Sequence, residues 1–422
     1  MQFTQYEANS LKQPATVQMI GRYKIEFHAF CAPGNENNHP VVFLGGAFQS
    51  FASFKSEVEL VYQTHPVILL DLPSQGSNDQ LVPEFELDSF AHLIKDFFDV
   101  QEINQVIMVG ISYGSAMATI FAAEYPQYMY RLLVSGITCF RRDSLVLLLE
   151  DSLRLLSQGE MQAFAATAVS NLINHNRMNE TEIGQTYRRL LFRQVARLNE
   201  NEQHRYAQNT ERLLRFGGFK KYPTCPTLVA TGEFDNFTLP EENAAFAEQC
   251  PDAQFAVIRD ADHLSQFERR EVTSELFYRF MKMESIDNIE GAELVSRDDL
   301  ASTEKRLQPR LKPINSQSVL VDTTTNIEHE IEVKNINFSG CQIELNMSDL
   351  TISETSTGLF LKLPDMETPY HVRVLEKDHK VLRCVIIQRN IKEADALMAY
   401  LDQPEAFFDP TQIGFNQAAL LA

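Results

Sequence analysis

The pentapeptide GISYG at residues 110–114 combines residue types and spacing that point directly to chemistry. It follows the apolar segment Val106–Val109 and precedes a run of small residues, Ser115–Ala118. A G-x-S-x-G pattern between a buried strand and a helix is typical of a nucleophile elbow, a strained turn that projects a serine hydroxyl above a sheet. Glycine is needed at both ends because a side chain there would collide with the neighbouring strand or helix. The pattern predicts a serine-dependent acyl-transfer site at Ser112.

A serine nucleophile needs a general base and a group that orients that base. Asp235 follows the apolar run Thr227–Ala230, and His263 follows the run Phe255–Arg259. Both side chains therefore fall in loops at the carboxyl ends of predicted strands, where ligands bind in open α/β sheets. The chain order of serine, acid and histidine predicts that Ser112, Asp235 and His263 converge on one rim.

The orienting acid has competitors in the same loops. Glu233 precedes Asp235 by two residues, and Asp262 directly precedes the candidate base. Asp235 is preferred because it lies deepest in the loop that follows its strand. Glu233 and Asp262 stay open as alternatives.

Oxyanion stabilisation at such a site comes from backbone N–H groups. One candidate donor is the amide of Tyr113, which directly follows the candidate nucleophile. The other comes from the loop Gly45–Phe48, which follows the apolar run Val41–Leu44. We expect Ala47 to supply this second amide, with Phe48 as the alternative.

Residues 1–284 alternate short apolar runs with helix-forming segments. Wholly apolar runs of four or five residues are typical of buried parallel strands, and alternation with helices predicts a doubly wound α/β sheet. Residues 141–217 interrupt this alternation with an almost continuous helix-forming stretch rich in leucine. An insertion between two core strands is expected to act as a helical cap over the strand ends, although plain helical packing fits the same pattern.

The composition changes after residue 284. Residues 285–303 are acidic and aperiodic, which is typical of an interdomain linker. Residues 304–402 then show six short alternating runs and a final helix over Lys392–Leu401, which predicts a small six-stranded β-barrel domain. Residues 403–422 are expected to form a C-terminal tail.

Composition limits the partners of the chain. The 422 residues exceed what one core supports, so more than one domain is expected. A formal net charge of −20 argues against a nucleic-acid polymer or an anionic membrane surface as the main partner. The six cysteines are scattered without C-x-x-C pairs, so no metal site is predicted and a reducing compartment is favoured. The sequence shows no signal peptide and no apolar run long enough to cross a membrane, so we expect a cytoplasmic protein.

Residues from about 15 to 284 resemble an α/β-hydrolase with a helical cap. The segment Asp71–Ser77 is similar to the D-x-x-G-x-G-x-S stretch of that family, with Ser74 where glycine is usual. Gly45 stands where the family often has histidine, and Asp262 stands where it often has glycine before the catalytic histidine. The first departure removes a side chain that props the oxyanion loop, and the second could raise the basicity of His263 or compete to orient it.

A narrower similarity is to the enzymes that make hydroxyalkanoyloxy-alkanoates, the lipid precursors of rhamnolipids. It is carried by Gly46-Ala47, Ala52–Phe54, Asp71–Pro73, Thr238 and the candidate triad. This resemblance implies β-hydroxyacyl thioester substrates.

A second candidate site opens the β-domain. Arg306 and Arg310 are four residues apart, and the turn Asn335–Gly340 follows at the end of a predicted strand. Two arginines at the mouth of a barrel suit a phosphate, and a guanidinium can also contact a guanine edge or stack on its face. The asparagines add donors and acceptors for a base.

This second arrangement resembles the PilZ domain, the bacterial receptor for cyclic di-GMP, over residues 304–390. Arg306 and Arg310 match its R-x-x-x-R motif, while Asn335, Asn337 and Gly340 match its [D/N]-x-S-x-x-G motif, with asparagine at 337 replacing the usual serine. The resemblance implies cyclic di-GMP as a regulatory ligand.

The leading hypothesis is a cytoplasmic serine acyl hydrolase or acyltransferase, acting on an ester or thioester and regulated by cyclic di-GMP, with no cofactor for catalysis. One alternative is a non-catalytic cyclic di-GMP receptor that uses the hydrolase fold as an interaction platform. Another is an enzyme whose β-domain binds no ligand. The acyl substrate, the direction of regulation and the oligomeric state are not predicted.

Overall fold

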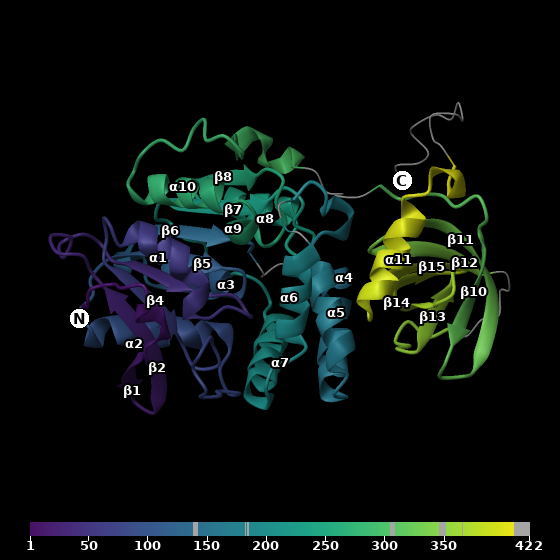
Figure 1. The fold of residues 1–422 in the computed structure, drawn as a ribbon, viewed down its shortest axis with the longest axis horizontal. Helices are drawn as coiled ribbons and strands as arrows, with labels where there is room; N and C mark the ends of the chain where they lie inside the picture. The colour runs from purple at the N-terminus through teal and green to yellow at the C-terminus, as the bar shows by residue number, and fades with distance from the viewer. Residues whose placement is uncertain are drawn as a thin grey trace. The chain divides into compact units, whose positions relative to one another are not determined.

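The protein is described from a computed structural model, which divides into two compact units (Figure 1). The first unit comprises Met1–Arg141 and Asn171–Lys305, and the second comprises Arg142–Ser170 and Arg306–Ala422. The structure describes residues 1–137, 142–181, 183, 185–303, 309–345, 352–364 and 366–408.

A nine-stranded sheet forms the centre of the first unit, with the strand order β1-β2-β4-β3-β5-β6-β7-β8-β9. Its strands are β1 (Thr16–Ile20), β2 (Tyr23–Phe30), β3 (Val41–Leu44), β4 (Val67–Asp71), β5 (Val106–Ile111), β6 (Met129–Ser135), β7 (Thr227–Gly232), β8 (Ala253–Ile258) and β9 (Ala292–Val295). In sheet order, the neighbouring strands β4, β3, β5, β6, β7 and β8 pair in parallel. The strands β1, β2 and β9 pair antiparallel with their neighbours. The predicted α/β-hydrolase sheet is confirmed. The central strands β3, β4 and β5 are buried along their whole length, which is why they appear in the sequence as unbroken apolar runs.

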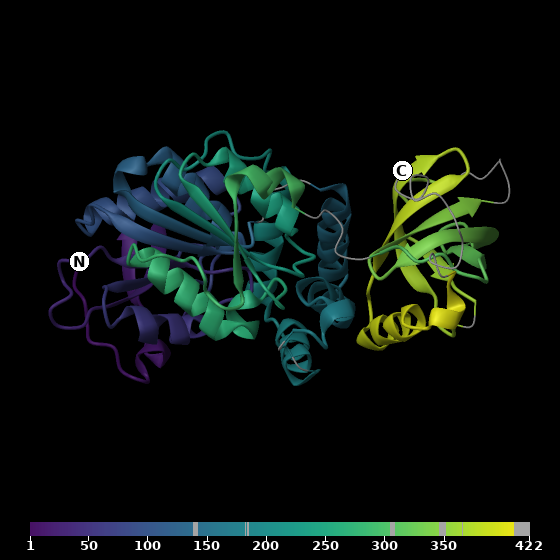
Figure 2. The same cartoon turned by 90° about the horizontal axis from the view of Figure 1, so that it is seen from above.

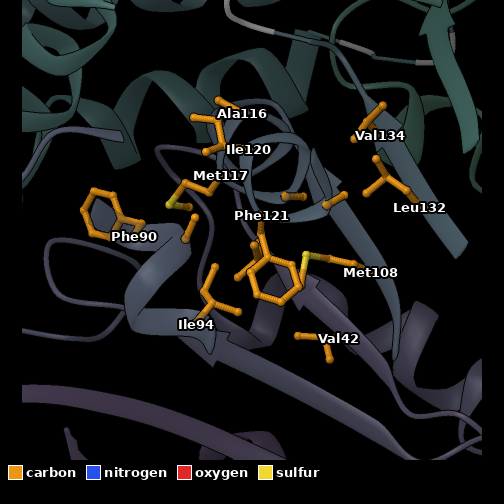
Figure 3. Packing of buried hydrophobic residues seen from close by; sticks show 14 of the residues in the cluster. Val42, Phe90, Ile94, Met108, Ala116, Met117, Ile120, Phe121, Leu132 and Val134 are labelled. Atoms are coloured by element: carbon orange, nitrogen blue, oxygen red, sulfur yellow. The ribbon is translucent and has the colours of Figure 1, made fainter. Parts of the chain in front are cut away.

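Helices cover both faces of this sheet (Figure 1). The helices of the unit are α1 (Lys55–Val61), α2 (Leu87–Val100), α3 (Tyr113–Glu124), α6 (Gln185–Val195), α7 (Glu200–Arg215), α8 (Pro240–Gln249), α9 (Ser265–Glu268) and α10 (Arg270–Met281). Short 3-10 helices lie at Ser10–Lys12, Phe51–Phe54, Pro126–Tyr128, His175–Arg177 and Arg297–Ser302. On one face, Phe90 and Ile94 of α2 and Phe121 of α3 pack over Met108 of β5 (Figure 3). These buried side chains fix α3 directly behind the strand that precedes Ser112.

The segment predicted as an interdomain linker is partly ordered in the sheet. Within residues 285–303, β9 pairs antiparallel with β8, and Ile286 and Ile289 are buried among the residues that pack under α10. Four residues are too few to show a strand period in the sequence, so this edge strand escaped detection.

The second unit contains a closed six-stranded barrel in the order β10-β11-β12-β15-β14-β13, which confirms the predicted six strands (Figure 2). The strands are β10 (Gln317–Asp322), β11 (Ile327–Asn337), β12 (Gly340–Leu345), β13 (Leu359–Lys362), β14 (Tyr370–Asp378) and β15 (Val381–Ile387). Helix α11 (Ile391–Leu401) follows, and its residues Ala394 and Leu397 join the buried apolar cluster of the barrel. A 3-10 turn lies at Pro404–Ala406, and residues 409–422 of the predicted tail lie outside the described residues.

Two helices from the middle of the chain belong to the barrel unit. Helix α4 (Asp143–Ser157) and most of α5 (Met161–Leu172) fall in the second unit, whereas α6 and α7 fall in the first. The sequence groups residues 141–217 as one cap on the hydrolase domain, because all of its helices lie between two strands of the same sheet. The contacts instead divide this segment between the two units.

The turn between β5 and α3 leaves no room for a side chain at either glycine of the elbow. A Cβ atom on Gly110 would lie 2.6 Å from the carbonyl oxygen of Gly114, and one on Gly114 would lie 2.2 Å from the carbonyl oxygen of Leu44. Both neighbours are backbone atoms, which cannot move away by a change of rotamer as a side chain could.

We expect Gly114→Ala to destabilise the first unit although alanine is the better helix former. Overpacking typically costs about 1–3 kcal/mol and the contact here is with backbone, so it outweighs the gain of about 1 kcal/mol in helix propensity. Differential scanning calorimetry should show a lower Tm for the transition of this unit. Gly217→Ala is the matched control, since nothing lies within 4 Å of its added Cβ. Equal Tm values for the two variants would contradict the close approach.

Candidate active site

The backbone at Ser112 has the strained geometry of a nucleophile elbow. Ser112 lies between β5 and α3 with φ 50° and ψ −119°, a conformation that residues other than glycine rarely adopt. Its N–H donates to the carbonyl of Ser135 at 2.8 Å, and its own carbonyl accepts from Ser115 N–H at 2.8 Å. These bonds, together with the packing of α3, hold the turn in place.

Three predicted side chains form one hydrogen-bonded chain. Nε2 of His263 lies 3.0 Å from Oγ of Ser112, and Nδ1 of His263 lies 2.9 Å from Oδ2 of Asp235. Asp235 is buried and accepts further hydrogen bonds from Phe237 N–H and from both the N–H and the hydroxyl of Thr238. The structure therefore brings together the histidine, the serine and the acid that sequence reasoning preferred, at separations suited to general-base catalysis.

The two competing acids face other partners. Glu233 pairs with Arg259, with 2.6 Å between the guanidinium and the carboxylate. The carboxylate of Asp262 accepts from Leu264 N–H at 3.0 Å and from Asn174 N–H at 3.0 Å. Neither group bonds to the ring of His263 among the described contacts, so Asp235 alone has the orienting geometry.

The charge state of His263 is set by opposing influences. Burial alone lowers the pKa of His263, but the carboxylates of Asp235 and Asp262 outweigh it, so the pKa of the imidazole is raised above its ordinary value. A raised pKa makes the ring a stronger proton acceptor. The sequence-based suggestion that Asp262 adds to the basicity of His263 agrees in direction with this arrangement.

The candidate oxyanion loop packs directly on Ser112. A Cβ on Gly46 would lie 3.1 Å from Cβ of Ser112, so only glycine allows this approach without displacement. Gln49 holds the loop, because its side-chain oxygen accepts from Gly46 N–H at 2.7 Å while its own N–H donates to Gly46 O at 3.1 Å. Sequence reasoning missed Gln49. It noted only that Gly45 lacks the usual supporting histidine, and the structure shows Gln49 supplying the support from within the loop.

The two candidate oxyanion donors are the backbone N–H groups of Tyr113 and Ala47. Tyr113 is the first residue of α3, so its N–H lies at a helix N-terminus next to the candidate nucleophile. Ala47 is exposed, and its N–H makes no backbone hydrogen bond within the described part of the chain. Phe48 instead stacks on Tyr206 of α7, with 5.4 Å between the ring centroids, and its carbonyl accepts from Gln194 of α6.

A second carboxyl pair lies behind His263. The N–H of Asp262 donates to Oε2 of Glu268 at 2.5 Å, and both side chains are buried. Burial and the nearby charge of Asp262 raise the pKa of Glu268 far above its ordinary value, so this carboxyl is protonated at neutral pH. The loop that carries His263 is thus fixed by a protonated acid on one side and by Asn174 on the other. Nothing in the sequence spacing pointed to Glu268 or Asn174.

A cavity of about 330 Å³ lies beside the oxyanion loop. It is bounded by residues 47–50 of that loop, by Ser74–Gly76 in the loop after β4, and by α6 and α7. The described residues hold no group of three or more histidine, cysteine, aspartate or glutamate side chains arranged to bind a metal ion.

The predicted second site can be followed in part. Nη1 of Arg310 donates to Oδ1 of Asn335 at 2.9 Å, and Oδ1 of Asn337 accepts from Gly340 N–H at 2.9 Å. A Cβ on Gly340 would lie 2.6 Å from Cys384 O on the neighbouring strand, which explains the glycine. Arg306 lies outside the described residues.

Among the helices that the structure describes, none is both long enough and apolar enough to cross a membrane.

Comparison with known proteins finds transacylases and a hydrolase among the relatives of this chain. An (R)-3-hydroxydecanoyl-ACP:CoA transacylase of Pseudomonas aeruginosa is 24% identical over 274 residues, which cover 61% of this chain and 85% of that protein. The enzyme of the same name from Pseudomonas putida is 24% identical over 64% of this chain and 91% of its own length. A 2-hydroxy-6-oxononadienedioate/2-hydroxy-6-oxononatrienedioate hydrolase of Cupriavidus pinatubonensis is 24% identical over 61% of this chain and 91% of its own length.

Solved structures show the same fold over the first unit. MGS-M2, an alpha/beta hydrolase from a deep-sea metagenome library of the Medee basin, aligns with a TM-score of 0.55 and 20% identity over 64% of this chain and 99% of its own. The enol-lactonase of Burkholderia xenovorans aligns with a TM-score of 0.55 and 14% identity over 63% of this chain and all of its own. The alpha/beta hydrolase fold family matches residues 39–270, the region that holds the elbow, both loops of the candidate triad and the oxyanion loop. The chain belongs to the α/β-hydrolase fold family.

Proposed function

We propose that the protein is a serine-dependent acyl hydrolase or acyltransferase. The observation that carries this proposal is the chain of hydrogen bonds from Asp235 through His263 to Ser112, at a serine held in a strained elbow. Ser112 is the nucleophile, His263 the general base and Asp235 the group that orients the imidazole. The N–H groups of Ala47 and Tyr113 receive the oxyanion.

The reaction follows from these positions. Oγ of Ser112 attacks the acyl carbonyl carbon while Nε2 of His263 accepts its proton, and the resulting oxyanion is stabilised by the two N–H groups. His263 then gives the proton to the leaving alkoxide or thiolate as the carbonyl reforms, which leaves an ester on Ser112. Water or a second thiol or hydroxyl attacks this ester, again with His263 as base, and releases the product with Ser112 restored.

The substrate class is an acyl ester or thioester, with a hydroxyacyl thioester as the preferred donor. Two of the relatives carry the name of an (R)-3-hydroxydecanoyl-ACP:CoA transacylase, which favours transfer between thioesters. The resemblance to hydroxyalkanoyloxy-alkanoate-forming enzymes also favours a 3-hydroxyacyl group. Coenzyme A and acyl carrier proteins act in the cytoplasm, so we propose that location as well.

We further propose that the barrel binds cyclic di-GMP and thereby regulates acyl transfer. Arg310 and Asn335 are hydrogen-bonded to each other, and Asn337 and Gly340 form the adjoining turn, so the described part of the motif is assembled. Arg306 completes the dibasic pair in this proposal. Arginines suit the phosphates and the guanine edges of such a ligand, and they stand out in a chain with a net charge of −20.

Ser112→Ala should abolish labelling by a fluorophosphonate probe and lower the turnover of 3-hydroxydecanoyl thioesters at least about 10³-fold, because the nucleophile is lost. Ser89→Ala, on the outer helix α2, is the matched control and should behave as wild type. The rate of wild-type labelling should fall as pH is lowered through the raised pKa of His263, since only the neutral ring accepts a proton. Equal turnover by wild type and Ser112→Ala on every acyl ester and thioester would overturn the catalytic proposal.

Isothermal titration calorimetry with cyclic di-GMP should show binding by the wild-type protein and a loss of at least about tenfold in affinity in Arg310→Ala, because a hydrogen-bonding guanidinium is removed. Arg383→Ala is the matched control, since Arg383 lies on the barrel but pairs with Glu376. Asn337→Ser restores the residue usual in the resembled motif and should tighten binding. Absence of heat with wild type would favour an enzyme with a silent barrel. Binding by a protein whose Ser112 is unreactive would favour the non-catalytic receptor.

A further inference from the structure

The cavity beside the oxyanion loop shares a wall with the candidate reaction centre. Ala47 and Phe48 line it, and the preceding Gly46 packs on Ser112. Only the oxyanion loop would therefore separate a group bound in this cavity from Oγ of Ser112. The opposite wall comes from α6 and α7, helices of the same compact unit.

Two arginines give this cavity a net positive charge. Arg205 is fixed there, because its guanidinium donates to the carbonyls of Gly76 and Asn78 and only 14% of its side chain is exposed. Arg197 also lines the cavity, and within the described residues it has neither an ion-pair partner nor a side-chain hydrogen bond. Glu202 is the one acid on the wall. It lies 3.8 Å from Arg205 and also accepts from Asn199 N–H, so it does not neutralise Arg197.

The remaining wall is rich in amides and hydroxyls rather than in apolar side chains. Gln75, Gln194 and Asn209 contribute amide groups, and Ser74 contributes a hydroxyl. These side chains hydrogen-bond to one another or to nearby protein groups, so the wall is polar and held in place. A polar wall offers an acyl chain little apolar surface to pack against. It suits a hydrophilic ligand with an anionic end.

We propose that this cavity binds the phosphate-bearing pantetheine arm of a thioester substrate, with Arg197 as the group that contacts the phosphate. The assignment rests on the proposed function, in which the acyl donor is a thioester of coenzyme A or of a carrier protein. Both carriers present the same chemistry, a phosphate joined to an amide-containing arm. The exposed amide of Gln194 lies where it can bond to those amides, and Arg197 offers the charge.

The test compares two thioesters of one 3-hydroxyacyl group, the coenzyme A ester and the N-acetylcysteamine ester, which lacks the phosphate. Arg197→Gln should raise KM for the coenzyme A ester about tenfold and leave kcat unchanged, while KM for the N-acetylcysteamine ester stays within twofold of wild type. Arg193→Gln, four residues earlier on α6 and outside the cavity, is the matched control. Repeating the comparison with an acyl carrier protein as donor distinguishes the two carriers.

Equal changes on both esters, or no change on either, would overturn the phosphate assignment. If wild type turns over neither ester, the proposed function fails, and direct titration of phosphopantetheine into the protein still decides the cavity. Binding that weakens about tenfold in Arg197→Gln supports the assignment, and absence of binding to wild type overturns it.

A different set of contacts concerns how the barrel could act on catalysis. Within the second unit, the hydroxyl of Thr167 on α5 donates to the carbonyl of Gln388 at 2.9 Å in a buried position. The side chain of the same Gln388 donates to the carbonyl of Phe338 at 3.3 Å. Phe338 lies in the turn Asn335–Gly340, the proposed ligand motif. One barrel residue thus bonds both to that turn and to the helix.

A buried charge cluster holds α4 to the same barrel. Asp151 of α4 is fully buried and accepts from Arg154 on its own helix at 2.9 Å. Across the contact with the barrel, Arg373 of β14 lies 3.4 Å from the carboxylate and His371 lies 3.6 Å from it. Burial lowers the pKa of His371 to about 4, so Arg373 is the cation that the barrel supplies to this carboxylate. Separation of α4 from the barrel would remove that cation from a buried charge, which is costly.

The residues that directly follow α5 bond to the loops of the candidate triad. The helix ends at Leu172, and two residues later Asn174 belongs to the first unit. There its N–H donates to Asp262 and its side-chain amide donates to the carbonyl of Phe234 at 2.9 Å. These acceptors directly precede His263 and Asp235 in their loops.

We infer that α5 is a mechanical link between the barrel and the His263 loop, with Thr167 and Asn174 as its two attachment points and Asp262 as a positioning residue. A ligand that moves the Asn335–Gly340 turn would move Gln388, then α5, and then the loop that carries the base. Such a change alters catalysis only if ligand affinity differs between the two positions of α5. The regulatory part rests on the proposed binding of cyclic di-GMP.

The test uses Thr167→Val, which keeps the shape of the side chain and removes the hydroxyl. Loss of a buried hydrogen bond should make the amides of Asn174 and Leu264 exchange with solvent about fivefold faster in hydrogen–deuterium exchange. Thr368→Val, at an exposed position of the barrel, is the matched control. In the same variant, cyclic di-GMP should bind as in wild type while its effect on kcat falls at least threefold.

Unchanged exchange at Asn174 and Leu264 in Thr167→Val would overturn the link, whether or not the dinucleotide acts. If exchange accelerates but wild-type turnover does not respond to cyclic di-GMP, the link stands and the regulatory half of the proposed function fails. A full ligand response in Thr167→Val would show that the signal does not pass through α5.

Discussion

The close approach of α3 to β3 and β5 at the elbow is the constraint on which the rest of the site depends. A backbone separation that excludes even a methyl group at Gly114 forces the chain through a positive φ at Ser112. The strain of that turn is sustained by the buried face of α3, whose Phe121 packs among the side chains of β5 and α2 (Figure 3). Because the turn is rigid, the position of Oγ is fixed before any substrate arrives. The neighbouring strands β7 and β8 then place Asp235 and His263 beside that oxygen.

The parts of the site that follow from strand order could be predicted from the sequence. Ser112, Asp235 and His263 each follow an apolar run, and parallel strands bring their carboxyl ends to one edge, so local patterns were enough. Gln49 and Glu268 could not be found in this way. Gln49 acts through a hydrogen bond whose existence depends on how one loop curls, and Glu268 matters only because burial keeps it protonated beside Asp262. Neither property produces a hydrophobic periodicity or a motif in the sequence.

The division of the predicted cap between two units has the same physical origin. Sequence position places residues 141–217 inside the hydrolase domain, and the leucine stripes of these helices say only that one face is buried. The partner of that face is decided by particular long-range contacts, such as Asp151 with Arg373 and Thr167 with Gln388. The two residues of each pair are more than 200 positions apart in the sequence, so no local pattern predicts the contact. The edge strand β9 was missed for the simpler reason that four residues show no period.

The sharing of α5 changes what the barrel must do in order to regulate. A separate regulatory domain acts on its target through an interface that associates and dissociates. Each association costs the entropy of ordering the residues of that interface. Here Thr167 of α5 bonds to the barrel, and seven residues later, just beyond the end of the helix, the N–H of Asn174 donates to Asp262. This connection is covalent, so in the proposed regulation a ligand would need only to change the position of one helix. A coupling of 1–3 kcal/mol, the usual range for allosteric linkage, corresponds to one or two hydrogen bonds of the kind that Thr167 and Asn174 make. The hydrogen bonds of Thr167 and Asn174 are therefore of the right size to carry such a signal without any larger rearrangement of the sheet.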